Sequence, residues 1–181
     1  MVEKLWKRAC DGRLQLNDEY LRQLALFYAA AQIEELNLNL EPPPESRLDQ
    51  IEAAAAKQGV TVSRSHKEVS STLNELNIDH KMEVSPFENS IVNFNTSAML
   101  NIDIMISTKN ETENKKIAIE FNGPFHYIHC NGQDVESGTT KFKQRLLEKL
   151  NFTVVSIHWD NWRKAREANT SKDFLRNLIP H

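Results

Sequence analysis

The stretch KKIAIEFNGPFHYIHC, Lys115–Cys130, combines a strong strand pattern with a run of polar residues. Residues 117–121 are apolar apart from Glu120, which is typical of a buried strand. Asn122-Gly123-Pro124 then predicts a reversal of the chain. Two histidines and a cysteine follow within seven residues of that turn. The stretch therefore predicts a strand that carries one acid and ends at a polar loop.

A second apolar stretch, AMLNIDIMIS (98–107), precedes this strand, and the polar sequence TKNETENK separates the two. A hairpin centred on Glu111–Thr112 would place Asp103 opposite Glu120, with an apolar and a polar face. The apolar face would hold Ile102, Ile104, Ile106, Ile117, Ile119 and Phe121, and the polar face Asn101, Asp103, Glu120 and Asn122.

Two acids on opposite strands repel, so the pair needs a cation, a basic side chain or a proton to offset the repulsion. One explanation is Mg²⁺ held by Asp103 and Glu120 for phosphodiester hydrolysis. Another is neutralisation by Lys141 or Lys143 from the following helix. A register that differs by one residue would separate the acids. All three interpretations are compatible with the sequence.

His126, His129 and Cys130 are residue types that bind zinc. Structural zinc sites use four protein ligands, often in two spaced pairs, and the sequence shows no second pair. We therefore expect these histidines to form hydrogen bonds or to touch a ligand, and we predict no resident cofactor.

The pattern over residues 63–181 predicts an α/β domain with a mixed sheet covered by helices. A helix over 63–77 and a short strand over 80–87 precede the hairpin. A helix over 139–151, a buried strand over 152–159 and a last helix over about 160–178 follow it. The helix between the last two strands implies a parallel crossover.

Residues 1–60 predict a separate helical segment. Apolar residues recur at helical spacing within 1–40, the sequence EPPPES (41–46) is a stiff connector, and a second helix over 47–59 would end at Gly59. Because two or three short helices bury little on their own, we interpret this segment as the end or remnant of a helical-repeat array.

Composition limits the class of function. The 181 residues are 40% hydrophobic with a net charge of −3, which argues against nucleic-acid binding by bulk charge. Residues 1–99 hold 10 Lys/Arg against 15 Asp/Glu, and residues 100–181 hold 12 against 10. A nucleic-acid surface should therefore be a local patch in the second half.

The sequence has no apolar run of about 18 residues, so we predict no membrane span. Residues 1–20 show no targeting peptide.

The predicted helix over 139–151 has an apolar and a basic face. Lys141, Arg145 and Lys149 follow one another at four-residue spacing, with Lys143 beside them. The positive end of a helix and a basic row both suit phosphate. We expect phosphate contacts here; the alternative is an ordinary solvated face.

Aromatic and basic residues alternate in IHWDNWRKAR, where Trp159 and Trp162 stand beside Arg163 and Lys164. This composition suits stacking on single-stranded nucleic acid. The alternative is that a tryptophan, which we expect to be Trp159, closes the end of the sheet.

These motifs closely resemble the RAP domain (RNA-binding domain abundant in Apicomplexans) over about residues 63–178. IAIEFNGPFHY matches the family's first block, and GTTKFKQRLLEKLNFTVVSIHWDNW matches its second. Asn122 stands where the family usually has Asp, Gln144 where a base is common, and Asn151 where Gly is common.

The resemblance implies a restriction-endonuclease-like fold of the PD-(D/E)XK type, similar to mismatch-repair nucleases of the Vsr type, with an αβββαβ core. It also implies helical repeats before the domain and action on mitochondrial or chloroplast RNA. In the nuclease motif a lysine follows the strand acid by two residues. Here that position is Asn122, and Lys141 or Lys143 could substitute from the helix.

The resemblance thus implies a mitochondrial or other organellar RNA-binding protein, a non-catalytic subunit of a ribosome or ribonucleoprotein. Its partners would be organellar rRNA or mRNA and other ribonucleoprotein subunits, without a membrane. The expected RNA-binding residues are Asn122, Phe125, His126, Lys141, Lys143, Arg145, Arg163 and Lys164. One alternative is an Mg²⁺-dependent endoribonuclease using Asp103, Glu120, Lys141 and Lys143. The other is a protein–protein adaptor with an unused RNA surface.

Overall fold

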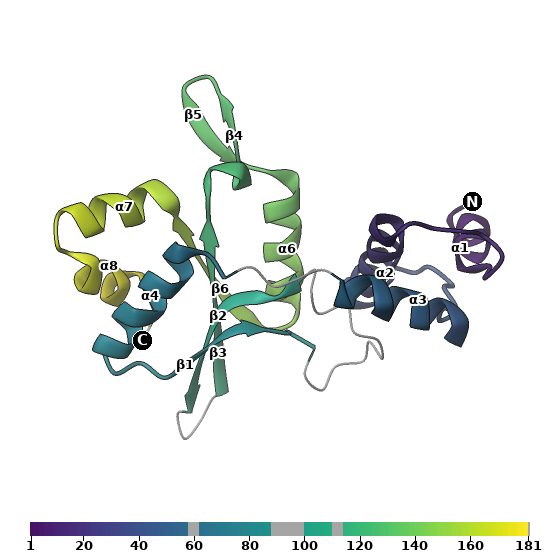
Figure 1. The fold of residues 1–181 in the computed structure, drawn as a ribbon, viewed down its shortest axis with the longest axis horizontal. Helices are drawn as coiled ribbons and strands as arrows, with labels where there is room; N and C mark the ends of the chain where they lie inside the picture. The colour runs from purple at the N-terminus through teal and green to yellow at the C-terminus, as the bar shows by residue number, and fades with distance from the viewer. Residues whose placement is uncertain (58–61, 88–99, 110–113, 181) are drawn as a thin grey trace. The chain divides into compact units, whose positions relative to one another are not determined.

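The computed structural model describes residues 1–57, 62–87, 100–109 and 114–180 (Figure 1). The chain divides into two compact units, Met1–Val60 with Ser85–Asn101 and Thr61–Val84 with Ile102–His181. The predicted helix end at Gly59 and hairpin centre at Glu111–Thr112 lie outside the described residues. Among the described helices, none has both the length and the apolar character that a membrane span requires.

The first unit is helical, with α1 (Val2–Cys10), α2 (Asp18–Ile33) and α3 (Glu45–Ala56). Helix α2 begins after Asn17, whose side chain accepts a hydrogen bond from the Tyr20 backbone N–H at 2.9 Å. Trp6 stacks on Tyr28 with ring centroids 5.2 Å apart. These rings pack with alanines of α2 and with Ile51 of α3, so the helices share one small core.

The second unit contains a four-stranded mixed sheet in the order β1-β2-β3-β6. Its elements are α4 (Arg64–Glu75), β1 (His80–Val84), β2 (Ile102–Lys109), β3 (Asn114–Asn122), α6 (Gly138–Lys149), β6 (Phe152–His158), α7 (Trp159–Glu167) and α8 (Ser171–Leu178). Strands β3 and β6 are parallel and the other pairs antiparallel. The predicted αβββαβ order and mixed α/β class are confirmed, whereas the likeness to restriction endonucleases stays a prediction.

Helices cover both faces of this sheet, with α4, α7 and α8 on one face and α6 on the other (Figure 1). On the first face, Ile104 and Ile119 pack with Val69 of α4 and Trp162 of α7. On the second face, Ala118, Phe152 and their neighbours pack against Leu147 of α6. The core tryptophan of this unit is Trp162, at 2% exposure, whereas Trp159, which we expect to close the end of the sheet, is partly buried.

A second hairpin, which we did not predict, follows β3. After a short 3₁₀ helix, η1 (Pro124–His126), strands β4 (Tyr127–Cys130) and β5 (Gln133–Glu136) pair antiparallel and project from the sheet (Figure 1). Asn131 and Gly132 form its turn with φ of 51° and 76°. Asn-Gly is the preferred pair for such a two-residue turn, so the sequence did contain a signal for it.

The predicted helix over 160–178 is two helices, α7 and α8. Asn169 interrupts it with φ of 56°, in the left-handed region that asparagine tolerates better than most residues. The Thr170 N–H then donates to the Ala165 carbonyl, as at many helix ends. The break lets both helices pack on the same face of the sheet, where Trp162 and Leu175 share one core.

Candidate functional site

The register of β2 and β3 brings two acids side by side. Ile104 pairs with Ile119 and Met105 with Ala118, as predicted, and the next residues along the two strands are Asp103 and Glu120. The Asp103 Oδ2 accepts a hydrogen bond from the Phe121 backbone N–H at 2.8 Å. This side chain thus continues the ladder in place of a backbone carbonyl.

The alternation of faces breaks at Asp103. Ile104 packs on the α4 side of the sheet, but Ile102 packs with Leu147 of α6 on the opposite side. The expectation that Ile102 shares a face with Ile104 is therefore wrong. Strict alternation would place Asp103 on a polar face with Glu120, but Asp103 instead turns toward the backbone of β3 and the first turn of α4.

Glu120 is buried, at 7% exposure, and Lys143 of α6 donates to its Oε2. Its Oε1 has no hydrogen-bond partner among the described residues. Burial raises the pKa of Glu120 to about 7, the charge of Lys143 opposes this rise, and the charge of Asp103 adds to it. Of the two lysines proposed to neutralise the acids, Lys143 is the one that reaches them.

Two further residues join this cluster, and sequence reasoning missed both. His66 of α4 lies with Nδ1 3.4 Å from Glu83 Oε1 and with Nε2 3.3 Å from Asp103 Oδ2. Glu83 stands between the pairs Met82–Ile104 and Val84–Ile102, which places it opposite Asp103. Burial and the Asp103 charge raise the pKa of Glu83. The register of β1 could have revealed Glu83, but no pattern in α4 singled out His66.

Phe125 and His126 lie on η1, beside the start of α6. The Phe125 side chain is 98% exposed. The His126 Nδ1 lies 3.2 Å from Thr140 Oγ1, and its carbonyl accepts from the Ser137 N–H at 2.8 Å. These bonds fix η1 to the helix. Desolvation lowers the pKa of His126, and the charge of Asp103 opposes this shift.

Helix α6 presents its basic row to solvent. Its N-cap, Ser137, accepts from the Thr140 N–H at 3.3 Å, and Leu146 and Leu147 are buried against the sheet. Lys141, Arg145 and Lys149 are exposed. Neither Lys141 nor Lys149 forms an ion pair with any residue in the described ranges. The Arg145 guanidinium lies over the Phe142 ring, 5.2 Å from its centroid.

Asn122, by contrast, is not on the surface. It is 2% exposed and pairs with His158 of β6 in the parallel ladder. Its Nδ2 has no hydrogen-bond partner in the described part of the chain. Its predicted direct contact with RNA would require the end of the sheet to open.

A comparison with family models matches residues 119–178 to the RAP domain. This segment is therefore similar to RAP domains. It begins in β3 and ends at α8, so it contains Glu120, Phe125, Lys143 and the basic row, whereas Asp103 precedes it. A RAP domain indicates RNA binding, and the resemblance predicted from the sequence is confirmed over this range. A search of curated proteins finds no match.

Helix α7 lies within the matched segment, and its basic side chains form ion pairs with acidic ones. Arg163 and Lys164 pair with Asp160 at 2.6 and 2.8 Å, and Arg163 also pairs with Glu167 at 3.0 Å. Hydrogen bonds from both bases lower the pKa of Asp160 to about 2. This helix therefore offers phosphate less uncompensated charge than Lys141 and Lys149 of α6 do.

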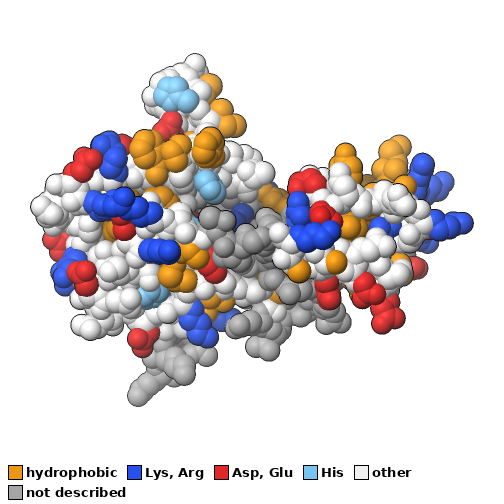
Figure 2. All heavy atoms as spheres, viewed as in Figure 1, with side chains coloured by type: hydrophobic (Ala, Val, Ile, Leu, Met, Phe, Trp, Pro, Cys, Tyr) orange, Lys and Arg blue, Asp and Glu red, His pale blue; other side chains and the backbone are white. Residues whose placement is uncertain are grey.

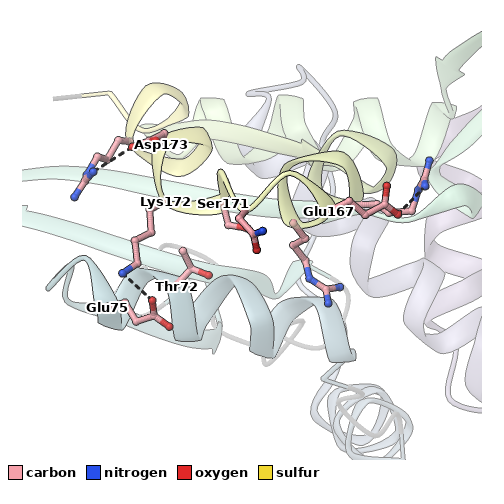
Figure 3. Close-up of a pocket in the computed structure, with 10 residues that line it drawn as sticks. Thr72, Glu75, Glu167, Ser171, Lys172 and Asp173 are labelled. Atoms are coloured by element: carbon pink, nitrogen blue, oxygen red, sulfur yellow. Dashed lines mark hydrogen bonds and ion pairs between the residues drawn. The ribbon is translucent and has the colours of Figure 1, made fainter.

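A groove of about 780 Å³ lies between α4, α7 and α8 (Figure 3). Lys172 points to Glu75 across it, at 3.0 Å, and Arg176 pairs with Asp173 at 3.2 Å. Its bases are thus paired with neighbouring acids. Of the predicted site residues, Arg163 lines this groove, whereas the acids and the basic row of α6 do not.

The residues first compared with a zinc site do not converge. His129 pairs with Asp134 at 3.0 Å on the β4–β5 hairpin, whereas His126 bonds Thr140. Within the described ranges, the ligand-type atoms that converge belong to His66, Glu83 and Asp103, all within 4.8 Å of one another.

Proposed function

We propose that this chain binds single-stranded RNA through a surface formed by Phe125, His126, Lys141 and Arg145, here called the Phe125 surface. The observation that carries the proposal is the 98% exposure of Phe125 beside the start of a helix with an exposed basic row. An exposed aromatic ring offers a flat apolar face that a partner can cover. A base can stack on the ring while Lys141 and Arg145 bind phosphates.

The surroundings of the surface fit this chemistry. Ile128 and Val135 are also exposed on the projecting hairpin, and Figure 2 shows hydrophobic and histidine side chains there. The RAP match covers the whole surface. Because the remaining charge of the chain is nearly balanced, RNA affinity should come from this patch and not from the protein's overall field.

Binding without catalysis is the function that we favour. Glu120 is buried and bonded to Lys143, and Asn122 occupies the position where the nuclease motif has lysine. The bond to Lys143 neutralises the Glu120 carboxylate, and Asn122 lacks the positive charge of a lysine. Phosphodiester cleavage would use both charges. The alternative, an Mg²⁺-dependent endoribonuclease, draws support from the adjacent positions of Asp103 and Glu120.

At the finer level, we propose a standing subunit of a mitochondrial ribosome or another organellar ribonucleoprotein that contacts rRNA. The RAP match supports the RNA partner. Residues 1–60 contain 7 Lys/Arg and 10 Asp/Glu, a balance that suits a protein partner better than RNA. In this proposal the helical unit contacts other subunits, while the Phe125 surface contacts RNA.

The test is the salt dependence of binding to an unstructured RNA oligonucleotide. For Lys141→Ala/Arg145→Ala we expect the slope of log affinity against log salt to fall by about 1.4, since each phosphate contact on a single strand contributes about 0.7. For Phe125→Ala we expect a loss of about 1–3 kcal/mol with an unchanged slope, because stacking is not ionic.

The matched control is Arg163→Ala/Lys164→Ala, which removes two paired bases from α7 and should change the slope by less than half as much. An unchanged affinity and slope in both Phe125-surface variants would contradict the proposal and favour the adaptor. Mg²⁺-dependent cleavage of the RNA that Asp103→Ala/Glu120→Ala abolishes would establish the endoribonuclease instead.

A further inference from the structure

We infer that His66, Glu83 and Asp103 form a binding site for one divalent transition-metal ion, with Zn²⁺ the best match. Its three ligands are not members of the Phe125 surface. Two of its three ligands, His66 and Glu83, lie before the RAP match and outside the pair of acids that would hold Mg²⁺ in a nuclease.

The geometry of the three side chains suits one ion. They come from three elements, α4, β1 and β2, and each offers one ligand atom within 4.8 Å of the others. Ligand atoms about 2.1 Å from one zinc ion lie roughly 3–4 Å apart. Glu83 now faces His66 Nδ1 and Asp103 faces His66 Nε2, so one carboxylate has to turn toward the nitrogen that binds the ion.

The residue types select the metal class. An imidazole nitrogen with two carboxylate oxygens is a donor set that suits Zn²⁺ and related transition metals, whereas Mg²⁺ prefers oxygen ligands alone. Three protein ligands also leave a coordination position open for water or a substrate oxygen.

The acids around the cluster also favour a cation. The Glu120 side chain is more than nine-tenths buried, and its Oε1 lacks a hydrogen-bond partner in the described part of the chain. Its carboxyl group is close enough to Asp103 for that charge to raise its pKa. Glu83, Asp103 and Glu120 thus place three carboxyl groups on adjacent strands, and Lys143 bonds to Glu120. Neighbouring carboxylates repel one another, and a cation held between Glu83 and Asp103 would offset that repulsion.

The experiment is a Zn²⁺ titration of the metal-free full chain by calorimetry, with Mg²⁺ as the competitor. We expect one ion per chain and no displacement by millimolar Mg²⁺. His66→Ala and Glu83→Gln should each weaken Zn²⁺ binding about 100-fold, because each removes one of three ligands. His66→Gln, which keeps a polar side chain of similar length, serves where the alanine variant fails to fold.

Two controls locate the ion. His129→Ala/Cys130→Ser removes the other zinc-type side chains from the hairpin and should leave the affinity unchanged. Glu120→Gln should change it by no more than a few fold. Loss of binding in the hairpin variant, loss in Glu120→Gln but not in Glu83→Gln, or no binding at all would each overturn the inference. Imidazole ¹⁵N shifts of His66 on Zn²⁺ addition provide the same test in the unaltered chain.

Discussion

Replacing Lys143 with methionine is expected to lower the free energy of unfolding by about 3 kcal/mol at pH 8 and by much less at pH 5. The pKa of Glu120 is raised to about 7 in the folded protein, from about 4.5 in the unfolded chain. The protonated side chain therefore contributes its full stabilising free energy below pH 4.5. That contribution is lost as the pH rises through 7. Without Lys143 the carboxylate at pH 8 is buried and unpaired, whereas at pH 5 it is protonated in both proteins.

Urea unfolding at pH 5 and pH 8, in EDTA, measures this effect. Lys141→Met is the matched control, because Lys141 lies on the same helix but is exposed and should cost less than about 0.5 kcal/mol. Lys143→Met/Glu120→Gln should recover most of the loss at pH 8. An equal loss at both pH values would show that Lys143 acts through packing and not through its charge.

Replacing Arg47 with methionine is expected to destabilise the helical unit by about 2–4 kcal/mol. Arg47 is fully buried, and its guanidinium donates to the Asp11 carbonyl, to the Leu14 carbonyl at 2.9 Å and to Gln50 Oε1. It therefore ties the loop between α1 and α2 to α3. Methionine fills part of the space but removes the Arg47 donor from both carbonyls, and among the described residues only the Asp11 carbonyl keeps another donor, the Leu14 N–H.

Hydrogen exchange of peptides from α2 reports on this unit specifically. Arg13→Met is the control, because Arg13 also bonds Asp11 but has an almost fully exposed side chain, so its loss should be within about 0.5 kcal/mol. If α2 exchanges no faster in Arg47→Met than in Arg13→Met, the buried guanidinium does not hold the unit together.

The fold of the second unit was largely predictable because its signals are local and periodic. Alternating isoleucines on two strands around one polar turn define a single register, and that register pairs Ile104 with Ile119. The basic row of α6 follows from helical spacing alone, and the structure exposes it as predicted.

The rest of the candidate site depends on contacts that spacing does not report. His66 meets Glu83 and Asp103 only because α4 packs at the β1 edge of the sheet, and Lys143 reaches Glu120 only because α6 covers the other face. The burial of Asn122 depends on the parallel pairing with β6. Which tryptophan enters the core depends on where α7 begins, and that boundary leaves no clear mark in the sequence.

Ultraviolet crosslinking of the full chain to RNA, with the crosslinked residues mapped by mass spectrometry, tests the central claim most directly. The account predicts crosslinks at Phe125 and along the exposed face of α6, including Lys141. Crosslinks confined to α7 and α8 or to residues 1–57, with none in residues 124–149, would contradict it.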